Sequence, residues 1–131
     1  MSKECIFCKI IKGDIPSFKF YEDQFCIGVM DKFPAMEGQA LIVSKVHENY
    51  FFDLSESNYR GCLMAAKKIV KAIDKALDTE RTCLVVEGFE VPHAHIKLFP
   101  TFGDGLKIHG GEEADNSDLK DYSKKYRENI I

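Results

Sequence analysis

The chain has 131 residues, of which 45% are hydrophobic and 30% are charged, a composition typical of one globular domain. Its formal net charge of −3 argues against a general affinity for nucleic acid or for an anionic membrane. No apolar run approaches the roughly 20 residues that a membrane-spanning helix needs, and residues 1–5 lack the apolar core of a secretion signal. We therefore expect a cytoplasmic protein with one domain over residues 1–131.

The N-terminal segment carries two cysteines, Cys5 and Cys8, in the motif Cys-Ile-Phe-Cys-Lys-Ile-Ile. This spacing places both thiols on the same side of one helical turn, and Gly13 suits the position that follows the helix. A single C-x-x-C pair supplies two of the four ligands of a structural zinc site. The same pair also fits a redox centre or an incidental arrangement. The other cysteines lie in apolar segments and are expected to be buried free thiols: Cys26, Cys62 and Cys83.

The next elements are predicted from their apolar patterns. Residues 18–21 and 25–31 predict a hairpin, and residues 39–45 predict an apolar strand that ends before His47. A lone histidine at such a place is ordinarily a surface residue. From Ser55 the apolar residues recur at steps of three and four, which predicts a helix of roughly twenty residues packed across a sheet. Ser55 or Ser57 is its expected N-cap. The predicted apolar stripe is Tyr59, Leu63, Ala66, Val70, Ile73 and Leu77, widened by Cys62, Ile69, Ala72 and Ala76.

Residues 82–87 predict another strand, and a bend at 88–90 leads to the segment Val-Pro-His-Ala-His-Ile-Lys-Leu-Phe-Pro at 91–100. Strict alternation from His93 to Phe99 predicts a half-buried strand, which Pro92 and Pro100 should bracket. One set of side chains should point into a core: Ala94, Ile96 and Leu98. The other set should line an open face, with neighbours roughly 6.5–7 Å apart: His93, His95 and Lys97. Two imidazoles and an ammonium in one row suit the handling of an anion.

The remaining residues predict a glycine-rich loop and a short helix. The loop carries His109, which we expect to be exposed to solvent. An amphipathic pattern then predicts a terminal helix whose apolar face docks on its own domain or on a second subunit: Leu119, Tyr122, Tyr126 and Ile130.

Three of these segments together resemble the histidine triad (HIT) family. They are the Cys5–Cys8 motif with Asp14-Ile15-Pro16 behind it, residues 38–47 (Gly-Gln-Ala-Leu-Ile-Val-Ser-Lys-Val-His) and residues 91–100. The resemblance covers roughly residues 5–100 and leaves 101–131 as a C-terminal extension with a helix. It implies an α+β fold in which an antiparallel sheet of about five strands carries one long helix. It also implies a homodimer.

The resemblance further implies an enzyme, either a nucleotide hydrolase or a nucleotidyl transferase. Its substrate would be a purine nucleotide derivative, such as a dinucleoside polyphosphate or a nucleoside phosphoramidate. His95 matches the nucleophile that attacks the α-phosphate and forms a nucleotidyl-histidine, which water then releases. A neutral imidazole is a competent nucleophile near pH 7. Asp31 matches the acidic residue that binds the ribose, and Phe7 and Ile10 match positions that wall the base.

Many bacterial members of the family hold zinc between two N-terminal cysteines and two histidines. The matching positions here are Cys5, Cys8, His47 and His93. Two thiolates and two imidazoles form a closed tetrahedral set suited to a structural zinc. Such an ion would anchor the N-terminal turn to the histidine strand, where His93 also belongs to the catalytic row. A zinc hydrolase with an open metal position is a further alternative, but four available ligands argue against it.

The chain departs from the family pattern at several positions. Lys97 replaces the third histidine; its ammonium pairs with phosphate oxygens but is a weak proton donor near neutral pH. Alternatively, Lys97 directs its charged head into solvent. Gln39 and Ser44 replace a common histidine and a common proline, and Glu90, in a shortened loop, should repel a phosphate. These differences favour a second hypothesis, a nucleotide-binding module of the same fold with weakened catalysis.

Overall fold

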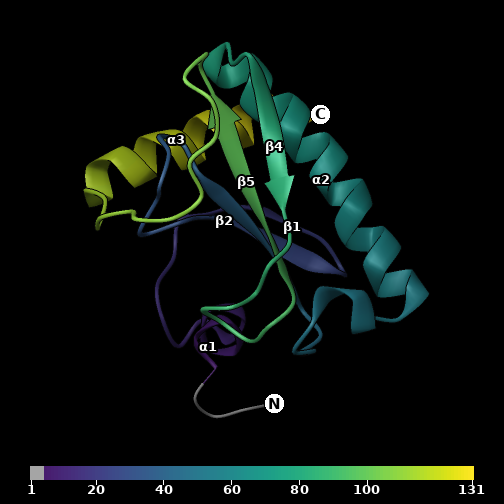
Figure 1. The fold of residues 1–131 in the computed structure, drawn as a ribbon. Coiled ribbons are helices and arrows are strands. Elements are labelled where there is room, and N and C mark those ends of the chain that lie inside the picture. The colour runs from purple at the N-terminus through teal and green to yellow at the C-terminus, as the bar shows by residue number, and fades with distance from the viewer. Residues whose placement is uncertain (1–4) are drawn as a thin grey trace.

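The structure, a computed structural model, describes residues 5–131 and contains one antiparallel sheet of five strands in the order β1-β2-β3-β5-β4 (Figure 1). The strands are β1 (Lys19–Glu22), β2 (Cys26–Met30), β3 (Ala40–Ser44), β4 (Arg81–Val85) and β5 (His95–Thr101). The helices are α1 (Ile6–Lys12), the 3-10 turn η1 (Phe51–Asp53), α2 (Glu56–Leu77) and α3 (Asn116–Asn129). This architecture confirms the predicted α+β fold. Within residues 5–131, no helix is long and apolar enough to cross a membrane.

The sheet separates two hydrophobic clusters because side chains alternate between its faces. On β3, Ala40 and Ile42 join the larger cluster beneath α2 and α3. Leu41 and Val43 join a smaller cluster with Phe7 of α1 on the opposite face. The long helices therefore cover one face of the sheet, and α1 covers part of the other (Figure 1).

Helix α2 begins where the sequence predicted. The Ser55 hydroxyl accepts a hydrogen bond from the backbone N–H of Asn58, 3.2 Å away, and so caps the first turn. The buried face of the helix is centred on the side of the predicted stripe that Cys62, Ile69 and Ala72 widen. Its buried members are Gly61, Cys62, Ala65, Ala66, Ile69, Ala72 and Ile73, while Tyr59, Leu63, Val70 and Leu77 lie at its margins. Small residues occupy the centre because the helix packs closely on the sheet.

Helix α3 docks on its own chain. Leu119 and Tyr126 are buried in the larger cluster, with Tyr122 and Ile130 packed against it. The Tyr126 hydroxyl donates to the Gly38 carbonyl at 2.6 Å. Gly38 has φ +81°, and a Cβ there would stand 2.6 Å from that hydroxyl oxygen. Glycine at this position therefore permits both the turn and the close approach of α3.

Strand β5 begins and ends two residues later than predicted. Before the strand, the Ala94 N–H donates to the Glu48 carbonyl in the loop after β3, whereas the His93 N–H donates to the Val91 carbonyl. Pro100 does not end the strand but lies inside it, opposite Thr82 of β4. It is tolerated because β3 starts opposite Leu98, so no β3 residue pairs with the proline. Ala94, Ile96 and Leu98 face the larger core as predicted.

Candidate functional site

Four side chains from distant parts of the chain meet beside α1: Cys5, Cys8, His47 and His93. Cys5 caps α1, and the left-handed Gly13 ends that helix as predicted. The Nδ1 atom of His93 lies 3.2 Å from Cys5 Sγ, 3.5 Å from Cys8 Sγ and 2.9 Å from His47 Nδ1. The four ligand atoms all lie within 4.8 Å of one another. Ligands of a tetrahedral zinc stand roughly 3.3–3.8 Å apart, so small shifts, including a wider separation of His47 from His93, would complete the set.

The tautomer of His93 supports a metal-binding role for the cluster. Its Nε2 lies 2.7 Å from the Ser44 carbonyl oxygen, and because a carbonyl only accepts, Nε2 carries the proton. Nδ1 is then left with a free lone pair that faces two sulfur atoms and a second imidazole nitrogen. Burial lowers the pKa of His93 and raises the pKa of the Cys8 thiol. Lone pairs that converge in this way fit a soft cation such as zinc.

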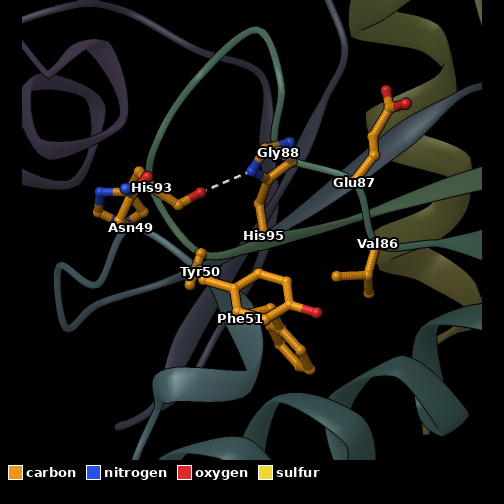
Figure 2. A pocket seen from close by; sticks show the side chains of 9 residues that line it. Asn49, Tyr50, Phe51, Val86, Glu87, Gly88, His93 and His95 are labelled. Carbon is orange, nitrogen blue, oxygen red and sulfur yellow. Dashed lines mark hydrogen bonds between the residues drawn. The ribbon is translucent and has the colours of Figure 1, made fainter.

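His95 is the first residue of β5 and is held by the residue two positions before it. Its Nδ1–H donates to the His93 carbonyl at 2.6 Å (Figure 2). This bond fixes the tautomer and leaves Nε2 unprotonated. The ring is 5% exposed, and burial lowers the pKa of His95 below its ordinary value. Phe7 packs edge-on against it, with ring centroids 4.9 Å apart. The imidazole is therefore oriented, neutral and available as a nucleophile.

The histidine row is not the open face that the alternation predicted. His93, His95 and Lys97 are only 1%, 5% and 8% exposed. On the adjacent β3, Leu41 and Val43 lie directly opposite Lys97 and His95. The row is buried because α1 and the segment between β4 and β5 cover this face of the sheet.

Lys97 ends in a buried ion pair. Its Nζ lies 2.7 Å from Glu87 Oε1, and both side chains are 9% exposed. The alternative in which Lys97 directs its head into solvent is therefore wrong. The other oxygen of Glu87 lies 3.5 Å from Nε2 of His109, which is 58% exposed as expected for the loop after β5. Glu87 also lines a small cavity with His95, Tyr50 and Phe51 (Figure 2).

Asp31 follows β2 and is held by Gln39. The Gln39 amide nitrogen donates to Asp31 Oδ2 at 2.7 Å, and its amide oxygen accepts from the Ala35 backbone N–H at 2.6 Å. Asp31 Oδ1 accepts from the Phe33 N–H. Burial raises the pKa of Asp31, and the positive charge of Lys97 acts against that shift. The carboxylate is thus fixed at the end of the strand.

The structure brings most of the predicted site residues to one face of the sheet. Phe7 is buried in the smaller cluster, where Ile10 packs at its edge. Two residues of the arrangement were missed by sequence reasoning: Glu87, regarded only as a strand end, and Gln39, noted only as a departure. A charged residue directly after an apolar strand was the available signal for Glu87. Its partner depends on the pairing of β4 with β5, which the sequence pattern does not reveal.

The chain is similar to a known protein family, to characterised sequences and to solved structures. Residues 12–104 match the HIT domain. The adenosine 5'-monophosphoramidase of Saccharomyces cerevisiae is 33% identical over 127 residues, which cover 95% of this chain and 79% of the relative. A HIT-like protein from Bartonella henselae has a TM-score of 0.87 at 26% identity and covers 99% of this chain and 98% of its own. A zinc-bound histidine triad family protein from Mycobacterium smegmatis has a TM-score of 0.78 at 24% identity, over 95% of this chain and 91% of its own.

Proposed function

This chain belongs to the HIT domain family, and we propose that it is a nucleotide hydrolase or nucleotidyl transferase that uses His95 as its nucleophile. The observation that carries the proposal is the hydrogen bond from His95 Nδ1–H to the His93 carbonyl, which leaves Nε2 free. The match to an enzyme named as an adenosine 5'-monophosphoramidase supports nucleotide hydrolysis at the level of the family.

The proposed reaction has two steps. First, Nε2 of His95 forms a bond to the α-phosphorus, and the bond from phosphorus to the leaving amine or phosphate breaks with its electron pair going to the leaving atom. The leaving atom takes up a proton from the site or from water. Water then forms a P–O bond, the P–N bond to His95 breaks, and the nucleoside monophosphate leaves as the water's proton passes to solvent. In a transferase, an acceptor other than water would attack in the second step.

The other residues bind and orient the substrate. Asp31, which Gln39 holds by a hydrogen bond, would accept hydrogen bonds from the ribose hydroxyls. Phe7 and Ile10 would wall the base, and Lys97 would lie near the phosphate oxygens, where an ammonium stabilises developing negative charge. Suitable substrates are purine nucleoside phosphoramidates and dinucleoside polyphosphates.

A structural zinc ion fits the chain's own donor set. Cys5, Cys8, His47 and His93 would hold it, with the Ser44 carbonyl fixing the His93 ring from the other side. When bound, the ion would supply a cross-link between α1 and the start of β5. No reaction step depends on it. We also infer a homodimer, which the resemblance of the sequence supports.

A covalent trap tests the proposed nucleophile. The protein is mixed with adenosine 5'-phosphoramidate, quenched in base to preserve a phosphohistidine-type bond, digested and analysed by mass spectrometry. We expect the adenylyl group on the peptide that contains His95, with AMP as the product. His95→Ala should abolish the adduct and lower turnover on the order of 10⁴-fold or more, as for other nucleophile deletions. An adduct on another residue, or equal turnover in His95→Ala, would contradict the assignment.

A nucleotide-binding module with weakened catalysis is the second candidate. The Lys97–Glu87 pair favours it, because the cation that should meet the phosphate already has an anionic partner. The same experiment separates the two functions. Binding of AMP by calorimetry, without adduct and without turnover on either substrate class, would establish the binding module.

A further inference from the structure

Glu87 has no role in the proposed reaction, yet its side chain is one of the most enclosed charges near His95. It follows β4, whose Val85 lies opposite Lys97 in the sheet register. From there its carboxylate reaches the Lys97 ammonium at 2.7 Å. In the view of Figure 2, His95 lies between His93 and Glu87. Glu87 and His95 line the same cavity.

The Lys97–Glu87 ion pair is poorly explained by a contribution to the stability of the fold. A buried pair gives up the hydration of two charges, and replacing both partners by neutral side chains is often harmless to stability. Lysine also carries its charge on a flexible four-carbon stem. An ammonium on such a stem stabilises a transition state only if something holds it in place. Glu87 provides that restraint, and His109 contacts the second carboxylate oxygen from the loop after β5.

We propose that Glu87 is a positioning residue: its carboxylate, braced by His109, holds the Lys97 ammonium beside the phosphate that His95 attacks. This inference rests on the proposed function and deepens it. In this arrangement Lys97 and Glu87 act as one unit at the place of the family's third histidine. Lys97 touches the substrate, and Glu87 acts only through Lys97.

A double-mutant cycle on the chemical step tests this claim. The rate of adduct formation is measured in single turnover with saturating adenosine 5'-phosphoramidate for wild type, Glu87→Gln, Lys97→Gln and the double variant. Glutamine keeps the shape of Glu87 and removes its charge, whereas at position 97 it replaces the ammonium by a neutral polar side chain that is one bond shorter. We expect each single change to slow adduct formation roughly tenfold and the double variant to be no slower than Lys97→Gln, because residues that act as one unit are non-additive.

Two further measurements exclude simpler explanations. Glu128→Gln removes an exposed carboxylate from α3, which packs on the opposite face of the sheet, and should leave the rate within about twofold of wild type. The affinity of Glu87→Gln for AMP, measured by calorimetry, should be no weaker than that of wild type, so that the loss falls on the rate. A purely structural role would instead lower the folded fraction and leave the rate per folded molecule unchanged.

Each outcome decides the claim. A wild-type rate in Glu87→Gln, weakened AMP binding, or a double variant slowed by the product of the single effects would overturn it. If Glu87→Gln does not fold, Lys97→Gln and the neutral double variant still give the comparison; equal rates support the proposal and a further loss overturns it. His95→Ala keeps the two proposals apart. An adduct that persists there refutes the proposed function, whereas an adduct that is lost there while Glu87→Gln is normal refutes only this inference.

Discussion

At the residue scale, Gln39 connects the strand that carries Asp31 to the turn before β3. It is 2% exposed, and its amide group donates to Asp31 and accepts from two backbone N–H groups, those of Ala35 and Met36. An amide offers a donor and an acceptor in one planar group, which lets Gln39 serve a carboxylate and backbone N–H groups together. The position of Asp31, the proposed ribose-binding residue, therefore depends on Gln39.

Gln39→Leu keeps the approximate volume of the side chain but removes its polar atoms. The Ala35 N–H and one Asp31 oxygen then lose their partners, so we expect a loss of about 2 kcal/mol in the free energy of unfolding. Urea denaturation monitored by circular dichroism measures it. Gln24→Leu, at an exposed position between β1 and β2, is the control and should change stability by less than about 0.5 kcal/mol. An equal loss of stability in both variants would show that the hydrogen bonds of Gln39 do not stabilise the fold.

Sequence reasoning at the residue scale succeeds where a residue type is itself the signal. The cysteine and histidine cluster was predicted because four good ligands occur in family order, and the structure brings them together. The environment of Lys97 was not predicted. Alternation assigns a side chain to a face of a sheet, but it does not tell which loop covers that face. The burial of the histidine row and the contact with Glu87 both depend on that loop.

At the element scale, α3 is attached to the sheet through its tyrosines. Tyr126 is fully buried, packs edge-on against Phe20 with centroids 5.3 Å apart, and donates to the Gly38 carbonyl. Tyr122 also donates a hydrogen bond, to Glu37, but from a less buried position. The two side chains offer a matched pair in one helix.

Tyr126→Phe should destabilise the protein by about 1–2 kcal/mol, because the buried Gly38 carbonyl loses its partner while the ring stays in place. Tyr122→Phe is the control, and about 0.5 kcal/mol or less is expected there because water replaces the lost bond. Thermal unfolding of both variants under the same conditions gives the comparison. If Tyr122→Phe destabilises the protein as much as Tyr126→Phe does, burial of the Tyr126 hydroxyl is not the reason that its hydrogen bond stabilises the fold.

The elements themselves were largely predictable. The start of α2 followed from Ser55 and its periodicity, and the β1–β2 hairpin from two apolar runs separated by a short polar turn. The bounds of β5 were not predictable, because a proline such as Pro100 ordinarily marks the end of a strand. Its tolerance depends on where β3 starts, which is a property of the assembled sheet. Ala65, which belongs to the buried face of α2, was missed because a small residue carries little hydrophobic signal.

At the scale of the whole molecule, the cysteine and histidine cluster joins α1 to the loop after β3 and to the segment just before β5. Wild-type protein purified without chelator should hold about one zinc ion per chain, measured by atomic emission. Removing the ion should lower the melting temperature by roughly 10 °C, because a ligand present at a hundredfold excess over its dissociation constant contributes about 2.7 kcal/mol. Calorimetry with and without EDTA measures this shift.

Cys8→Ser should lose both the zinc and the response to EDTA. Cys83→Ser is the matched control, because Cys83 is a free, half-buried thiol on β4 outside the cluster; it should keep both properties. The zinc assignment fails if Cys8→Ser retains as much metal as wild type, or if EDTA shifts all three proteins equally.

The alternation of β5 has a consequence for how this protein tolerates change. Ile96 and Leu98 belong to the core under the long helices, whereas His95 and Lys97, which alternate with them, face the proposed reaction. Variation at the first pair would alter how much folded protein a cell accumulates. Variation at the second pair would alter what each folded molecule does. Selection on abundance and selection on activity therefore act on alternate residues of a single strand, and adjacent positions are free to evolve under different pressures.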